Sequence, residues 1–175
     1  MATIAYLVFC LFGLLSTTWA KGLKPRNPAL PRTTCPDGTL SYNFNFEVYC
    51  FEFFSNPLTF AEAEAACQRS GKDGHLASVT SAIQTDLIGT YVSESNWRGQ
   101  YVWIGLTLKP NSNPVSGWRW TDGTRFMYNS WAAGEPNDYA HQFNCAVLTP
   151  YLGNRLWVDA SCNSKNAFLC KWKPS

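Results

Sequence analysis

Cysteines constrain the fold of this chain more than any other feature of its sequence. The chain has 175 residues and seven cysteines, of which Cys10 lies in an apolar leader. The other six form an even set in a chain of about one domain, which favours disulfides over metal ligands. No short Cys-x-x-Cys spacing indicates a zinc site. Six cysteines allow 15 pairings, so their spacing alone leaves the disulfide pattern open.

Residues 1–20 predict a cleaved signal peptide. The segment is apolar over 4–15, carries no charge and ends in Thr18-Trp19-Ala20, with small side chains at the positions that a signal peptidase reads. The alternative is a membrane anchor, which needs ~20 apolar residues, and this run is shorter. No later segment is a candidate. We therefore expect a secreted, extracellular protein without a transmembrane segment.

Residues 21–34 predict a flexible, basic and proline-rich arm that precedes a domain over 35–175. The arm holds four of the 14 basic residues, three prolines and no acidic residue. The other ten basic residues face 12 acidic ones, so the rest of the chain has a formal charge of −2. Binding of phosphate backbones requires clustered positive charge on a folded surface, and we therefore expect no nucleic-acid partner.

Two helices followed by short strands are predicted, in an order that indicates an α+β domain. Thr59 and Glu62 form a capping-box pattern, and Phe60, Ala63 and Cys67 then recur on one helical face. A second helix is expected to begin at Ser81. Its expected apolar stripe consists of Ile83, Leu87, Ile88, Tyr91 and Val92. Beyond residue 99, runs rich in Trp, Tyr and Val between Asn, Pro and Gly clusters are typical of strands.

Three aromatic-rich segments resemble landmarks of the C-type lectin-like domain family. Trp103-Ile104-Gly105-Leu106 resembles its central buried strand, Gly117-Trp118-Arg119-Trp120 the next strand, and Asn166-Ala167-Phe168-Leu169-Cys170 the closing strand. The resemblance covers residues 35–172. Among secreted single-domain members it resembles the pancreatic-stone, eggshell-matrix and invertebrate soluble lectin groups. It implies an α+β, C-type lectin-like fold in which two helices flank small antiparallel sheets with a long-loop region.

The same resemblance implies three disulfides and a set of core aromatics. The implied pairs are Cys35–Cys50, Cys67–Cys170 and Cys145–Cys162. The first pair is further apart in the sequence than is usual in this family, so a longer hairpin is expected over 42–46. Large aromatic side chains that alternate along strands are expected in the core without any ligand. They are Trp103, Trp118, Trp120, Trp157 and Phe168.

Glu135-Pro136-Asn137, an EPN motif, is the candidate binding site. A carboxylate and an amide across a proline present two oxygens side by side if the Glu135-Pro136 bond is cis, an isomer that proline permits. In sugar-binding members of the family, calcium is held at five positions, which here are Glu135, Asn137, Phe143, Val158 and Asp159. Only three of these side chains carry oxygen, whereas calcium prefers six to eight oxygen ligands. The resemblance therefore implies calcium at an incomplete, weak site, with Gln142, Asn144 or water as further ligands.

The expected partners are glycans or glycoproteins. Glu135 can only accept hydrogen bonds and Asn137 can also donate, so two neighbouring hydroxyls would be held with one polarity. In the family this tripeptide goes with mannose-type sugars. Asp159 completes the expected site, and Tyr139 offers an aromatic face to a sugar, with packing on the domain as its alternative role.

A non-sugar function is the alternative. Phe143 and Val158 place apolar groups at two calcium positions, which suits a protein partner or a mineral surface, as in biomineral-matrix, antifreeze-like or venom-type members that have lost calcium-dependent sugar binding. An enzyme is not expected. His75 and His141 are the only histidines, and the chain contains no His-Glu-x-x-His or Gly-x-Ser-x-Gly motif.

Overall fold

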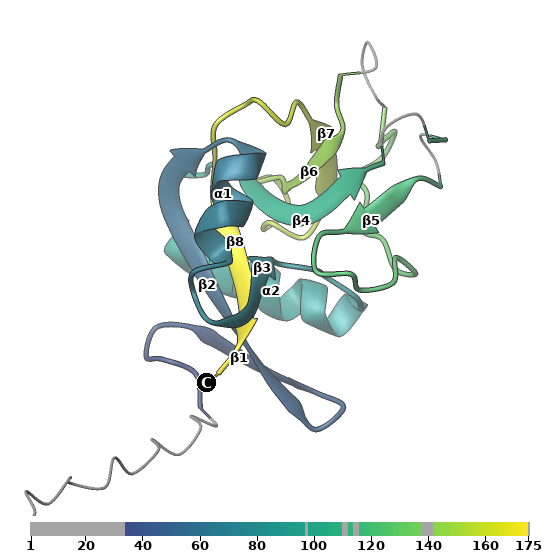
Figure 1. Ribbon diagram of the computed structural model, residues 1–175. Coiled ribbons are helices and arrows are strands. Elements are labelled where there is room, and N and C mark those ends of the chain that lie inside the picture. Colours follow the sequence, from purple (N-terminus) through teal and green to yellow (C-terminus); the bar gives the residue numbers. More distant parts are fainter. Residues whose placement is uncertain (1–33, 97, 110–111, 114–115, 138–141, 175) are drawn as a thin grey trace, which may run out of the picture. The chain divides into compact units, whose positions relative to one another are not determined.

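A computed structural model describes residues 34–96, 98–109, 112–113, 116–137 and 142–174 of the chain. The predicted signal peptide and the predicted arm, apart from Thr34, lie outside the described residues. Within them the elements are β1 (Leu40–Phe44), β2 (Glu47–Leu58), α1 (Phe60–Cys67), β3 (Lys72–Leu76), α2 (Ala82–Ser95), β4 (Val102–Leu108), β5 (Trp118–Trp120), β6 (Cys145–Leu148), β7 (Trp157–Ala160) and β8 (Asn166–Lys173), as Figure 1 shows. None of the described helices is long and apolar enough to cross a membrane.

The described strands form one mixed sheet. Its order is β1-β2-β8-β4-β6-β7, with β3 paired to β8 and β5 paired to β4. All pairs are antiparallel except β4 and β8, which run parallel with Trp103 opposite Phe168. The sequence predicted small antiparallel sheets. The parallel pair instead joins the β1-β2-β8 side to the β4-β6-β7 side, so the predicted landmark strands β4 and β8 lie together at the centre.

Helix α1 begins as the sequence predicts. The Thr59 hydroxyl accepts from the Glu62 backbone N–H, and the Glu62 carboxylate accepts from the Thr59 N–H at 2.9 Å. Phe60, Ala63 and Cys67 are buried. The capping-box prediction is confirmed, and Glu62 serves as a cap.

Helix α2 begins after Ser81 as predicted, but its buried face differs from the expected stripe. Ile83 is 69% exposed and Leu87 is 40% exposed. The buried side consists of Gln84, Thr85, Ile88, Gly89 and Val92. Polar residues occupy this face because they find partners there: Gln84 Oε1 accepts from the Thr80 N–H at 2.6 Å, and the Thr85 hydroxyl bonds the Tyr128 hydroxyl at 2.9 Å. The apolar pattern alone did not predict these partners.

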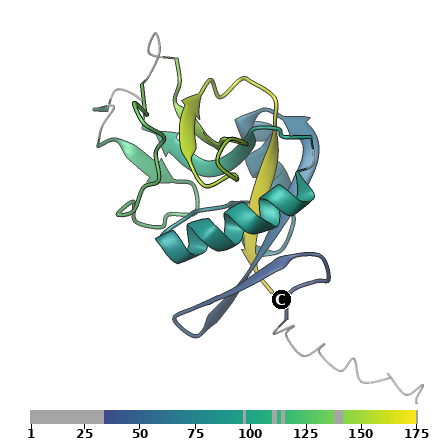
Figure 2. The same ribbon diagram turned by 180° about the vertical axis from the view of Figure 1, so that it is seen from behind.

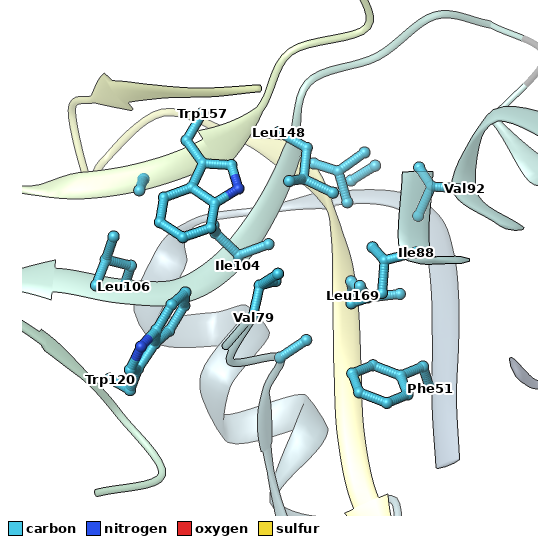
Figure 3. Packing of buried hydrophobic residues seen from close by; sticks show 14 of the residues in the cluster. Phe51, Val79, Ile88, Val92, Ile104, Leu106, Trp120, Leu148, Trp157 and Leu169 are labelled. Atoms are coloured by element: carbon cyan, nitrogen blue, oxygen red, sulfur yellow. The ribbon is translucent and has the colours of Figure 1, made fainter. Parts of the chain in front are cut away.

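The sheet separates two buried clusters, because successive strand residues point to opposite faces. On one face, helix α1 covers Trp103, Phe168 and Trp172. On the other face, helix α2 covers a cluster that includes Ile104, Leu169 and Trp157 (Figure 3). Figure 1 and Figure 2 show the two helices on opposite sides of the β2-β8 region. The five aromatics predicted for the core are all buried.

The structure contains the three disulfides that the resemblance implies. They join Cys35 to Cys50, Cys67 to Cys170, and Cys145 to Cys162. The expected hairpin is also present, since β1 pairs with β2 from Leu40↔Phe51 to Phe44↔Glu47. Asn45 and Phe46 form its turn, both at positive φ, which matches the twist of two-residue hairpin turns.

Candidate functional site

The long loop between β5 and β6 is attached to strand β7 through Trp157. The Trp157 N–H donates to the Ser130 carbonyl and the Ala132 N–H donates to the Trp157 carbonyl, both at 2.9 Å. Trp131, between these two contacts, packs edge-on against Trp118 and Trp157, with ring centroids 4.9 Å and 5.7 Å apart. Trp157 precedes Asp159 on β7 by two residues, and Ala132 precedes the Glu135-Pro136-Asn137 tripeptide by three. The attachment therefore holds the start of the tripeptide near Asp159.

A tight turn then presents the tripeptide. The Glu135 N–H donates to the Ala132 carbonyl at 3.0 Å, and Gly134 has φ of 85°, a conformation that glycine adopts without a steric cost. The Glu135-Pro136 peptide bond is cis. The Asn137 Nδ2 group donates to Glu135 Oε1 at 2.8 Å, so the carboxylate and the amide lie side by side.

Asp159 lies next to this pair. It sits on β7 opposite Ala146 of β6 and is only 6% exposed. Its Oδ1 atom accepts from the Asn137 backbone N–H at 3.4 Å. The structure therefore brings together Glu135, Asn137 and Asp159, which are up to 24 residues apart in the sequence. Tyr139, the other predicted site residue, lies outside the described residues.

Asp159 acts on the carboxyl group of Glu135. Burial of the Glu135 carboxyl, together with the hydrogen bond and the negative charge of Asp159, raises the pKa of Glu135 to about 7. Glu135 Oε2 is buried and has no hydrogen-bond partner among the described residues. A proton on Glu135 allows a carboxyl–carboxylate hydrogen bond to Asp159. A ligand that donates a hydrogen bond, or a cation, would satisfy the same oxygen.

Phe143 and Val158 occupy the two remaining calcium positions, and their hydrocarbon side chains have no oxygen to offer a cation. Both are partly exposed and line a hollow of about 250 Å³ that also has Asp159 in its wall. The Asn144 carbonyl, beside Phe143, accepts from the Leu108 N–H and the Thr107 hydroxyl. Among the residues that the structure describes, the side chains that bring oxygen to the motif are two carboxylates and one amide, from Glu135, Asp159 and Asn137.

Oxygen ligands of this kind can hold a hard cation, but the set is small. Among the residues that the structure describes, no group of three or more His, Cys, Asp and Glu side chains is arranged to hold a metal ion. Glu135, Asn137 and Asp159 supply carboxylate and amide oxygens, and the unsatisfied Oε2 of Glu135 is suited to a cation. These three side chains supply fewer than the six to eight oxygen ligands that calcium prefers.

Sequence reasoning missed two parts of this site. It did not predict that Trp131 attaches the long loop to Trp157, although a tryptophan within a loop of mostly small and polar residues was a signal for such an anchor. It also missed the hollow beside Asp159, whose wall includes Tyr101, just before β4, and Asn166, at the start of β8. The apolar residues at 143 and 158 were the available signal for it.

Comparisons with known proteins agree with this fold. Residues 56–172 match the family model "Lectin C-type domain". The alpha subunit of snaclec stejaggregin-A from Trimeresurus stejnegeri is 35% identical over 141 residues, which cover 80% of this chain and 82% of that protein. The structure of human lithostathine superposes with a TM-score of 0.71 at 32% identity, covering 86% of this chain and 99% of the other.

A third comparison is the cow C-type carbohydrate-recognition domain of CD23, solved in the presence of a GlcNAc2Man3 oligosaccharide. It has a TM-score of 0.63 at 27% identity and covers 82% of this chain and 99% of that one. The predicted fold is therefore confirmed. The matched family is one of lectin-like binding domains, generally without catalytic activity. This chain belongs to the C-type lectin domain family.

Proposed function

We propose that this chain is a secreted carbohydrate-binding module that recognises mannose-type glycans through Glu135, Asn137 and Asp159. The observation that supports this most is the convergence of these three side chains, with Asn137 Nδ2 2.8 Å from Glu135 Oε1 and the Asn137 N–H 3.4 Å from Asp159 Oδ1. Such a cluster offers acceptors and one amide donor at a surface turn. These are the groups that hold vicinal hydroxyls.

The order of the two motif residues supports the mannose-type preference. Glu135 accepts hydrogen bonds at one end and Asn137 can donate at the other, so a pair of hydroxyls is held in one polarity. In the family, this order goes with mannose, glucose or fucose, and the reversed order of Gln and Asp goes with galactose. The CD23 domain, a structural relative, was solved with a mannose-containing oligosaccharide.

Calcium is part of the proposal as a weakly bound ion. Glu135, Asn137 and Asp159 would hold it, and it would neutralise the carboxylates and offer a Lewis acid to sugar hydroxyl oxygens. Complete extracellular calcium sites already bind at only about 10⁻⁴ to 10⁻³ M, and this set has apolar residues at two of five positions. We therefore expect calcium to bind with a dissociation constant of about 10⁻³ M or higher.

A mannose column tests the proposal directly. The refolded domain is applied to mannose resin with calcium and then with chelator. We expect the resin to retain the domain and free methyl mannoside to compete with the resin for binding. Glu135→Gln combined with Asn137→Asp should move the preference toward galactose. Glu94→Gln, at an exposed position on α2, is the matched control and should leave retention unchanged. If the folded wild-type domain binds neither the resin nor free sugar, the proposed sugar-binding function is wrong.

Phe143 and Val158 favour one alternative function, a binding module for a protein partner or a mineral surface. Both side chains line an open hollow where the family places calcium ligands. Phe143→Glu together with Val158→Asn separates the two functions. Calcium binding and sugar affinity that appear only in this double variant would identify a lectin that has lost its site, whereas loss of partner or mineral binding would support the alternative.

A further inference from the structure

Strand β1 forms one edge of the sheet, and its outer side has no neighbour among the described strands. Residues of an antiparallel pair alternate between positions that exchange hydrogen bonds with the partner strand and positions whose N–H and C=O point away from it. Phe44 and Glu47 close the two-residue turn and pair with each other, so Tyr42 is the next residue bonded to β2. The backbone groups of Ser41 and Asn43 therefore point outward, and both residues are exposed.

This edge lacks the features that usually keep edge strands apart. Leu40–Phe44 has the sequence LSYNF, with no proline and no charged side chain, and it pairs with β2 without a bulge. An exposed edge of this kind can accept a further strand. The edge also belongs to a hairpin that is longer than is usual in the family, because Cys35 and Cys50 are 15 residues apart. It is therefore a feature of this chain rather than of the family.

The turn at the end of this hairpin carries a phenylalanine in an unfavourable conformation. Phe46 is fully exposed and has φ of 64°, a left-handed conformation that two-residue turns usually give to glycine. Phe44, next to the turn, is 49% exposed. Because the Phe46 ring gains little from packing within its own chain, its presence here favours a contact outside the chain.

Further apolar surface lies beside the hairpin on helix α2. The Tyr91 hydroxyl donates to the Gly38 carbonyl, just before β1, at 3.0 Å, and Figures 1 and 2 show α2 next to the β1-β2 hairpin. Ile83 and Leu87 precede Tyr91 by eight and four residues, so the three side chains share one side of the helix. Ile83 and Leu87 are exposed. The apolar stripe of α2 is therefore open on the side that carries the hairpin.

A second copy of this chain fits the edge better than a lipid surface does. Pairing two β1 strands antiparallel about Tyr42 places Ser41 of each copy opposite Asn43 of the other. Leu40 then comes opposite Phe44, and Tyr42 comes opposite its own copy. These are polar, aliphatic–aromatic and aromatic cross-strand pairs, and no like charges meet. A lipid surface would leave the N–H and C=O groups of the edge without partners, and α2 has two acidic side chains and no basic one to attract anionic lipid.

We propose that this chain forms a two-fold dimer in which the β1 strands pair antiparallel and join the two sheets. The same register places Phe46 opposite Gly38 of the second copy, and the space around this glycine is open. Strands β1 and β7 are at opposite ends of the strand order, so the pairing leaves the site at Asp159 free in both copies. One strand pair buries less than the ~1,200–2,000 Å² of stable complexes, so the dimer is weak.

Sedimentation velocity of the purified chain, from about 5 µM to about 1 mM, tests the dimer. We expect the mass to rise from one chain to two with a dissociation constant of about 10⁻⁴ M. Asn43→Pro removes an outward N–H, and Phe46→Gly removes the ring. Each should raise the dissociation constant at least about tenfold, and Phe46→Gly should not lower the melting temperature, because glycine adopts this φ without strain.

Leu152→Gly is the matched control. Leu152 is 75% exposed and has φ of 57°, like Phe46, but it lies in the loop between β6 and β7. This change should leave the dissociation constant within about twofold of wild type. Hydrogen exchange locates the contact. The N–H groups of Ser41 and Asn43 should exchange about fivefold more slowly at about 1 mM than at about 5 µM, because one fifth of the chains remain monomeric at the higher concentration.

The outcomes decide between a strand-paired dimer and its alternatives. A chain that stays monomeric at about 1 mM, or a dimer that both Asn43→Pro and Phe46→Gly leave unchanged, overturns the inference. A dimer without slowed exchange at Ser41 and Asn43 contradicts the strand pairing. Sedimentation of a monomeric chain with phosphatidylcholine vesicles, lost in Phe46→Gly, would overturn the dimer and assign the hairpin to a lipid surface.

Discussion

Replacing Glu135 by Gln should make the domain more stable and, at the same time, abolish its retention on mannose. Gln keeps the Oε1 atom that accepts from Asn137 Nδ2, and its Nε2 group, in place of the buried and unsatisfied Oε2, can donate to the carboxylate of Asp159. The substitution also removes a negative charge from beside Asp159. Binding sites often hold such destabilising groups for the sake of function.

The size of the gain follows from the pKa of Glu135. Burial and Asp159 raise it from 4.5 to about 7, so between these values the folded protein keeps a proton that the unfolded chain loses. The contribution of Glu135 to stability therefore falls as pH rises from 4.5 to about 7 and is constant above. At ~1.36 kcal/mol for each pH unit the ceiling is about 3.4 kcal/mol. Because the side chain is partly exposed, solvent screening reduces the expected gain to about 1–2 kcal/mol.

Urea unfolding in the presence of a chelator measures this effect. Glu135→Gln should raise the free energy of unfolding by about 1–2 kcal/mol at pH 8 and leave it within about 0.3 kcal/mol of wild type at pH 4, where Glu135 is protonated in both states. The exposed Glu94→Gln change is the control and should give no pH-dependent difference. An equal gain at both pH values, or none at pH 8, would refute the argument that burial and Asp159 act on this carboxyl.

Three further predictions concern the framework that positions the site. Lys171→Met should lower the free energy of unfolding, measured in urea, by about 3–5 kcal/mol. The substitution leaves the carboxylate of Asp122, whose side chain is 8% exposed, without the ammonium group that lies 2.6 Å away. Adding Asp122→Asn should restore a large part of the lost stability. Trp131→Ala should lower the free energy of unfolding by about 3 kcal/mol and weaken mannose retention, since it removes the ring packed on Trp118 and Trp157. Unchanged retention would contradict this prediction. Thr59→Ala should lower stability by about 1 kcal/mol without affecting sugar binding, which thermal unfolding and the mannose column check together.

Much of the fold was predictable because its signals are local. The capping box at Thr59 and Glu62 depends on residues three apart, and the β4 and β8 segments are short apolar runs that resemble landmark strands of the family, so both can be recognised before the chain is folded. The buried face of α2 was not predictable in this way. Gln84 is buried because its Oε1 atom accepts a hydrogen bond from the Thr80 N–H. Thr85 is buried because its hydroxyl forms a hydrogen bond with the hydroxyl of Tyr128, which is more than 40 residues away.

The amino-acid sequence by itself determined which chemical groups the site has available: a carboxylate and an amide around Pro136, a second carboxylate at Asp159, and apolar side chains at 143 and 158. Only the tertiary structure decided how they meet. The contacts of Trp157 with residues 130–132 bring Asp159 to the tripeptide, and this closeness, together with burial, raises the pKa of Glu135. Residue types are fixed by local sequence, whereas distance, burial and charge coupling arise only when distant segments pack together.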